Sequence, residues 1–151
     1  RFIGVGEVPP AGFRSALPNF EYRYSLGREA MAETMKMVDI WVGASHSEGL
    51  GRMALEAMSA GVAVITTDTG AEYAKHEENC LLVPRRDLTA QDQVLASQRV
   101  SAAIVSAAQR IIENLEFAHT LRIQAFETAA GCADPAPCMT ELQKVIADVF
   151  K

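Results

Sequence analysis

The chain has 151 residues, of which 49% are hydrophobic and 22% are charged. This length and balance suit a single domain with a buried core, and they argue against disordered, collagen-like and multi-domain proteins. The formal net charge of −5 provides no general attraction for nucleic acid or anionic lipid, because both carry negative phosphates. We therefore expect no nucleic-acid partner, and we expect any phosphate binding to occur at a local site.

The cysteines and the apolar runs indicate the compartment. Cys80, Cys132 and Cys138 have neither the number of a disulfide framework nor the spacing of a zinc site. Cys132 and Cys138 flank a proline-containing loop, so their pairing under oxidising conditions stays open. No apolar run approaches the roughly 20 residues that cross a bilayer, and the N-terminus lacks a signal-peptide pattern. The sequence therefore predicts a cytoplasmic protein.

Short apolar runs alternate with longer helical patterns, and this order predicts parallel β-strands that are joined and covered by helices. Each run ends near glycine, serine, aspartate or proline, as strands often do. We therefore predict an α/β, Rossmann-like fold in which five strands form one sheet: residues 2–6, 20–24, 40–44, 62–66 and 80–83.

The segments between these runs have helical spacing. Apolar residues three and four apart predict a helix over residues 28–38, and a further helix is predicted to start just after Gly49. A short helix over residues 68–75 is predicted next, followed by a left-handed turn at Asn79.

From Thr89 onward the pattern is wholly helical. One long helix is predicted first, then a second from about 116 to 129 that ends at Gly131, and finally an amphipathic helix over residues 139–149. The apolar stripe of the long helix is predicted to consist of Val94, Leu95, Ile104, Val105, Ala108, Ile111 and Ile112.

Residues 39–58 are the segment most informative about chemistry, because a predicted strand passes there through a polar turn into a glycine-flanked helix start. Ligands of open α/β sheets bind at the carboxyl ends of strands. The N–H groups of Gly49, Leu50 and Gly51 would lie at the positive end of the helix dipole, which suits a diphosphate. Glu56 would then lie about 9 Å further along the helix, where a carboxylate can accept hydrogen bonds from ribose hydroxyls. Glu48 would face a sugar on the other side of the phosphates; the alternative is a plain turn with two solvated glutamates.

The segment also resembles a known family. Ser45-x-x-Glu48-Gly49-Leu50-Gly51, followed by Leu55-Glu56-Ala57-Met58 and by Gly61-x-x-Val64-Ile65, is similar to the Glu-x7-Glu signature of retaining glycosyltransferases with the two-domain GT-B fold, group 1 or family 4. The resemblance continues in Gly4-Val5-Gly6 and in residues 78–84, and it covers the chain up to Asp87. It implies that residues 1–151 form one donor-binding domain, the C-terminal half of a GT-B fold, with a helical C-terminal region.

The resemblance assigns roles to individual residues. Glu48 would be the catalytic residue and would bind the transferred sugar, while Glu56 would bind the ribose and the amides of Gly49, Leu50 and Gly51 the diphosphate. Two further donor-binding candidates are Ser25, after the strand that leads toward the nucleotide base, and Arg52. The family usually has an apolar residue at the position of Arg52, so this arginine either reaches a phosphate or lies exposed in the first turn. The resemblance implies neither a metal ion nor a cofactor.

The function implied is transfer of a hexosyl group, with retention, from a nucleotide-diphosphate sugar to a glycan, lipid or small-molecule acceptor. The resemblance also implies a cytoplasmic enzyme of cell-envelope polysaccharide biosynthesis, and it leaves open a peripheral association with the membrane. The family's acceptor-binding N-terminal domain, and the first strand and helix that supply an Arg and a Lys for the diphosphate, have no counterpart in these residues. We therefore expect the chain alone to be inactive.

Two other functions stay open: a sugar-nucleotide epimerase of the same fold and a non-catalytic nucleotide-sugar-binding module. The presence of both glutamates and of the glycine turn argues against the second. A nicotinamide site is weakly supported, because Gly4-Val5-Gly6 lacks the third glycine of a dinucleotide fingerprint. His46 lies in the candidate loop without a clear role, and Arg85 and Arg86 are predicted on a solvated loop.

Overall fold

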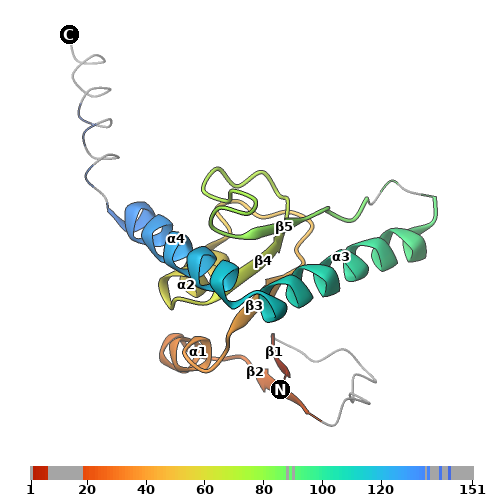
Figure 1. Ribbon diagram of the computed structural model, residues 1–151, viewed down its shortest axis with the longest axis horizontal. Helices are drawn as coiled ribbons and strands as arrows, with labels where there is room; N and C mark the ends of the chain where they lie inside the picture. The colour runs from red at the N-terminus through yellow and green to blue at the C-terminus, as the bar shows by residue number, and fades with distance from the viewer. Residues whose placement is uncertain are drawn as a thin grey trace. The chain divides into compact units, whose positions relative to one another are not determined.

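The computed structural model describes residues 2–6, 19–87, 89, 91–134, 136, 140 and 143. They belong to two compact units, Arg1–Met37 and Val38–Lys151. Both units contain parallel strands and helices (Figure 1), which confirms the α/β class. No helix among the described residues combines the length and the hydropathy that a bilayer span requires.

The first unit contains a two-stranded parallel sheet and one helix. β1 (Phe2–Gly6) pairs with β2 (Phe20–Tyr24), and both strands have the predicted bounds. α1 (Arg28–Met35) ends three residues earlier than predicted, because the Met37 N–H bonds to the carbonyl of Thr34 in a tight turn. Arg23 of β2 donates to Thr34 Oγ1 at 2.7 Å and thereby ties the helix to the sheet.

The second unit is built on a three-stranded parallel sheet in the order β3-β4-β5, formed by β3 (Ile40–Gly43), β4 (Ala63–Thr67) and β5 (Leu81–Val83). The five predicted strands are therefore divided between two sheets, one in each unit. Within the first unit β1 pairs with β2, and within the second β3 pairs with β4 and β4 with β5.

Three helices cover this sheet (Figure 1). α2 (Arg52–Ser59) contacts β3 and β4, α3 (Gln93–Glu113) contacts β4 and β5, and α4 (Leu115–Ala133) contacts α2, α3 and β4. β4 lies in the centre, and its apolar run is buried because strands of a covered parallel sheet lose both faces to the core. The core cluster consists of Ala63, Ile65, Leu81, Val83, Ile111 and Leu121.

The C-terminal helices differ from prediction in their ends and in their buried faces. Asn114 caps α4 by accepting the Phe117 N–H at 2.9 Å, and α4 continues through Gly131 instead of ending there. Only part of the predicted stripe of α3 is buried: Ile111 is 5% exposed, whereas Ile112 is 65% exposed. The predicted helix over residues 139–149 and the pairing of Cys138 fall largely outside the described residues, while Cys132 is exposed with a free thiol.

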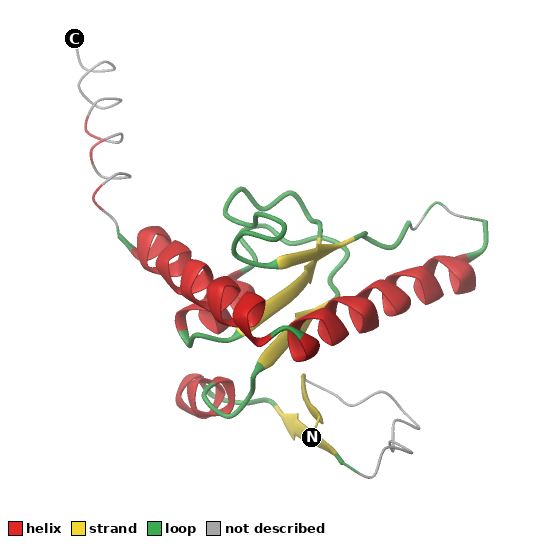
Figure 2. Cartoon of the chain, viewed as in Figure 1, coloured by secondary structure: helices red, strands yellow, loops and turns green. Residues whose placement is uncertain are grey.

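The connection from β4 to β5 is a loop, and the short helix predicted over residues 68–75 is wrong (Figure 2). Asp68 Oδ1 accepts the N–H of Gly70 at 3.2 Å. Asn79, which is 1% exposed, accepts the N–H of Lys75 at 2.9 Å. The Asn79 side chain thereby satisfies a backbone N–H that a helix would have paired internally. In the turn before β5 the left-handed residue is Glu77, with φ of +64°, and not Asn79 as predicted.

A tight turn at Gly51 precedes α2. Gly51 is the N-cap residue, with φ of +64°. This left-handed conformation is energetically unfavourable for residues that have a side chain. Its carbonyl accepts the N–H groups of Ala54 at 3.0 Å and Leu55 at 3.3 Å, and also the hydroxyl of Tyr73 at 2.9 Å. A Cβ at Gly51 would lie 2.5 Å from Tyr73 Oη. Glycine is therefore required here by the backbone angle and by the neighbouring side chain.

Replacing Gly51 by alanine should lower the free energy of unfolding by about 1–2 kcal/mol from the backbone angle alone, and more if Tyr73 has to move. Gly49→Ala is the matched control, because its Cβ would meet nothing within 4 Å. Urea denaturation of both variants measures the difference. Equal stability of the two would show that the turn does not constrain the fold.

Candidate functional site

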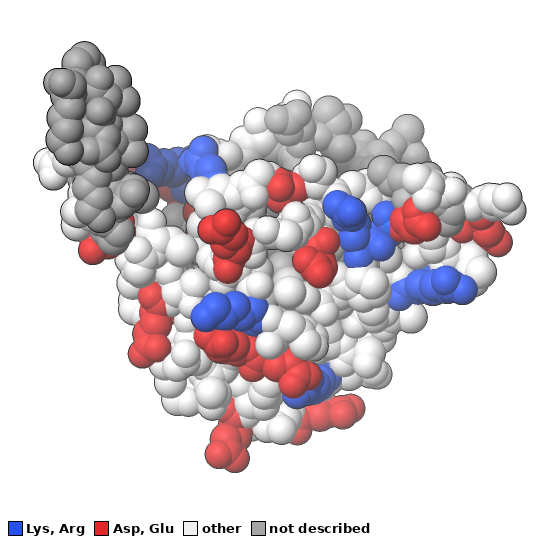
Figure 3. Space-filling view, turned by 90° about the horizontal axis from the view of Figure 1, so that it is seen from above, with Lys and Arg blue, Asp and Glu red and all other residues white. Residues whose placement is uncertain are grey.

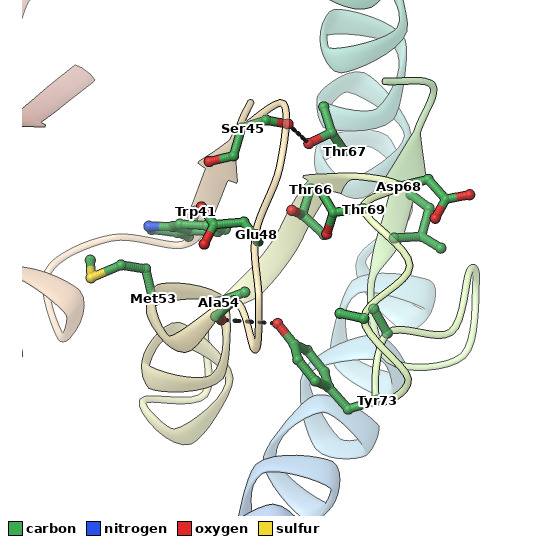
Figure 4. Close-up of a pocket in the computed structure, with 14 residues that line it drawn as sticks. Trp41, Ser45, Glu48, Met53, Ala54, Thr66, Thr67, Asp68, Thr69 and Tyr73 are labelled. Carbon is green, nitrogen blue, oxygen red and sulfur yellow. Dashed lines mark hydrogen bonds between the residues drawn. The ribbon is translucent and has the colours of Figure 1, made fainter. Parts of the chain in front are cut away.

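The candidate site lies at the carboxyl ends of β3 and β4, which meet at one edge of the sheet because the strands are parallel. The loop after β3 contributes polar side chains from one side, and the loop after β4 contributes them from the other (Figure 4). Together they form a pocket whose lining includes Trp41, Ser45, Glu48, Thr67, Asp68 and Tyr73.

Hydrogen bonds join the two loops. Thr67 Oγ1 donates to the carbonyl of Ser45, and Tyr73 Oη donates to the carbonyl of Gly51 (Figure 4). The indole of Trp41 lies against Gly43, where a Cβ would collide with the ring. The pocket is therefore bounded by groups that already hold one another in position.

Consecutive backbone donors lie beside this pocket. Within the part of the chain that the structure describes, the N–H groups of residues 49–53 donate to no protein acceptor. They comprise the glycine turn and the first two residues of α2, at the positive end of the helix dipole. Such groups bind anions with several oxygens, phosphates above all.

The two predicted glutamates flank these donors. Glu48 is exposed and lines the pocket. Glu56 is half-exposed on α2, and its Oε1 lies 3.9 Å from Nη2 of Arg52, whose side chain is 80% exposed. An ion pair this exposed and this long contributes little, so both side chains are available to a ligand.

The helix that carries Glu56 begins later than predicted. Because Gly51 adopts the left-handed conformation, α2 begins at Arg52 and not just after Gly49. Glu56 therefore lies about one turn, roughly 6 Å at 1.5 Å per residue, beyond the first helical residue. Leu50 lies outside α2, so the two helical turns predicted between Leu50 and Glu56 are not formed.

The predicted donor residues belong to different units. The structure groups Glu48, Gly49, Leu50, Gly51, Arg52 and Glu56 around the start of α2 in the second unit. Ser25 belongs to the first unit, where it follows β2 with φ of +45° and donates its N–H to the carbonyl of Gly6 at 2.9 Å.

The sequence interpretation missed several residues at this edge. Tyr73 and Thr67 contact the β3–α2 loop through bonds that span 22 residues, which no local pattern indicates. Arg86 is half-buried and donates to Ser97 Oγ at 3.3 Å, so the prediction that it lies on a solvated loop is wrong. Arg86 and His46 line a second pocket at the same edge, which shares Asp68 with the first.

The charges around the molecule are mixed. On the face in Figure 3, the described Lys and Arg side chains lie among Asp and Glu side chains and form no continuous basic area. Among the described residues, no group of three or more His, Cys, Asp or Glu side chains is placed to hold a metal ion.

Solved structures share this fold. The chain matches the C-terminal domain of a glycosyl transferase group 1 family protein from Francisella tularensis with 24% identity and a TM-score of 0.59, over 74% of this chain and 52% of that one. It matches sucrose-phosphate synthase from Thermosynechococcus elongatus with 22% identity and a TM-score of 0.71, over 98% and 38%. Anabaena HepE in complex with UDP-glucose matches with 19% identity and a TM-score of 0.62, over 87% and 33%. The chain thus spans about half or less of each of these structures.

The sequence comparison decides the family. No curated protein sequence matches the chain. The family model described as glycosyl transferases group 1 matches residues 1–114, which is more than half of the chain and includes the loop from Ser45 to Gly51. The chain therefore belongs to the group 1 glycosyl transferases, and its fold is that of their C-terminal GT-B domains.

Proposed function

We propose that the chain is the donor-binding domain of a retaining, family 4 glycosyltransferase that transfers a hexosyl group from a nucleotide-diphosphate sugar to a glycan, lipid or small-molecule acceptor. The observation that carries this proposal is the run of unpaired N–H groups at residues 49–53 between two available glutamates. The complex of Anabaena HepE with UDP-glucose supports the ligand class, since HepE shares the fold.

Each part of the donor has a proposed partner. The diphosphate would accept hydrogen bonds from the N–H groups of residues 49–53, and Arg52 would approach its outer phosphate. Glu56 would accept the ribose hydroxyls, because its carboxylate is half-exposed one turn along α2. Glu48, in the pocket lining, would hold the hydroxyls of the transferred sugar. Ser25 would take part in donor binding near the nucleotide base.

The chemistry follows from where charge develops. Breaking the bond between the sugar and the diphosphate leaves negative charge on the leaving oxygen. Fixed N–H donors aimed at that oxygen stabilise the transition state without reorganising during the reaction. We propose that these donors and Arg52 supply the stabilisation, so that the step requires neither a metal ion nor a cofactor.

The acceptor would come from outside these residues. Because the chain spans about half or less of the similar structures, we propose that residues 1–151 act as one donor-binding domain together with an N-terminal GT-B domain. Closure of two such domains excludes water and brings the acceptor hydroxyl to the anomeric carbon. On this proposal the chain alone binds donor without turnover, and the intact enzyme works in the cytoplasm or at the membrane surface, in cell-envelope polysaccharide synthesis.

The two glutamates should have separable effects on donor binding. Glu56→Ala should weaken UDP and UDP-glucose alike by about tenfold or more, since hydrogen bonds to a charged group contribute about 1.5–3 kcal/mol. Glu48→Ala should weaken UDP-glucose while leaving UDP unchanged, because only the sugar contacts it. Ligand-observed NMR at millimolar concentration measures both affinities, with GDP and ADP and their sugar conjugates in parallel.

Glu113→Ala is the matched control, because Glu113 is an exposed glutamate at the end of α3. It should bind every ligand as the parent chain does. If Glu48→Ala and Glu56→Ala also bind every ligand as the parent chain does, the assignment of the site is wrong.

Arg52 should contribute more to the affinity for a nucleoside diphosphate than to the affinity for a monophosphate. Arg52→Ala should weaken UDP more than UMP, because the side chain would contact the phosphate that UMP lacks. The same NMR titration compares the two ligands. An equal loss for both would mean that Arg52 acts elsewhere, as an exposed residue of the first turn.

A further inference from the structure

We propose that Tyr73 is a positioning residue of this site: its hydroxyl fixes the Gly51 peptide, and thereby aims the neighbouring N–H groups at the diphosphate. The inference rests on the proposed function for its ligand. Its geometry stands on the 2.9 Å bond from Tyr73 Oη to the Gly51 carbonyl (Figure 4).

The planar peptide transmits this contact. The Gly51 carbonyl and the Arg52 N–H belong to one trans peptide, so they point in opposite directions. Holding the carbonyl toward Tyr73 therefore holds the Arg52 N–H away from it. If the peptide turned over, the carbonyl oxygen would face the anion in place of a donor, and the site would lose one attraction and gain one repulsion.

The turn has little else to restrain it from the β4–β5 side. Gly49 and Gly51 have no side chains, and Leu50 between them is 62% exposed. Glycine makes the left-handed turn accessible, but it also leaves many other conformations open. Thr67 restrains the same loop only at Ser45, six residues before Gly51. Among the described residues, the Tyr73 hydroxyl is thus the side-chain group that bonds to the donor turn, and it adds to the bonds that the same carbonyl accepts from the N–H groups of Ala54 and Leu55.

Tyr73 is itself held in place. Its backbone carbonyl accepts a hydrogen bond from Nδ2 of buried Asn79 at 2.7 Å, and the same Nδ2 donates to Thr128 Oγ1 of α4 at 3.0 Å. The ring therefore reaches from a loop anchored on α4 to the first turn of α2. Burial above all, with smaller contributions from neighbouring groups that include Glu48, raises the pKa of Tyr73 to about 12. The hydroxyl consequently keeps its proton, and stays a donor, throughout the physiological range.

The decisive variant is Tyr73→Phe, which removes the hydroxyl and keeps the ring. It should lower the affinity for UDP about fivefold and leave the affinity for uridine unchanged, because only the phosphates depend on the turn. The control is Ser59→Ala, which removes a hydroxyl bonded at 2.8 Å to the Glu56 carbonyl, at the other end of the same helix. This control should leave the ratio of UDP to uridine affinity at the parent value.

A second measurement reports directly on the conformation of the turn. In ¹⁵N-labelled chain, Tyr73→Phe should shift and broaden the amide signals of residues 49–53 while those of α4 stay in place. Ser59→Ala should leave the signals of residues 49–53 unchanged.

The outcomes separate the two proposals. A parallel loss of UDP and uridine affinity in Tyr73→Phe would overturn the inference, because Tyr73 would then stabilise the fold in general. Unaltered amide signals at residues 49–53 would overturn it as well. If the parent chain binds no nucleotide at all, the proposed function fails, and the amide signals alone decide whether Tyr73 positions the turn.

Discussion

The hydrogen bond between Tyr73 Oη and the Gly51 carbonyl joins the two loops on which the candidate site depends. One loop follows β3 and carries Glu48 and the glycine turn, and the other follows β4 and carries Asp68 and Tyr73. Neither loop has regular structure of its own. Their mutual contacts, together with the buried strands beneath them, therefore determine the direction in which the backbone donors at the start of α2 point.

The rigid part of the second unit lies below these loops. β4 is buried in the centre of the sheet, and Ile65, Leu81 and Leu121 are among the large buried side chains of its core. Asn79 connects this core to the loop above it, since its amide joins the backbone near Tyr73 to Thr128 of α4. A polar group that is 1% exposed is tolerated there because the side chain has partners for its donors and its acceptor. The arrangement places the glycine turn, which Tyr73 holds, above a buried core.

Local patterns predicted the fold well where local forces decide it. The strands at residues 2–6 and 20–24 have the predicted bounds, those at 40–43 and 81–83 differ by one residue at one end, and the strand at 63–67 is shifted by one residue, because apolar runs mark strands directly. The segment from Glu48 to Glu56 was also predictable, since its glycines and carboxylates lie close together in sequence. Their roles in binding remain predictions.

Long-range contacts account for most of the errors. The helix predicted over residues 68–75 fails because Asn79, held by Thr128 from 49 residues away, bonds to that backbone instead. The division of the strands between two sheets was not predicted, because pairing between strands is not encoded in the apolar runs themselves. Gly131 does not end α4, since a helix tolerates glycine at a modest cost. Tyr73 left no local signal, because its partner lies 22 residues earlier.

The central claim is that the start of α2, with the two loops beside it, binds a nucleotide-diphosphate sugar. The most direct measurement is a titration of ¹⁵N-labelled chain with UDP-, GDP- and ADP-glucose, followed through the backbone amide signals. The account predicts that at least one of these ligands shifts the signals of residues 48–53 most strongly, with smaller shifts at Glu56 and at residues 68–73. Shifts confined to other surfaces, such as the exposed start of α3, would contradict the account.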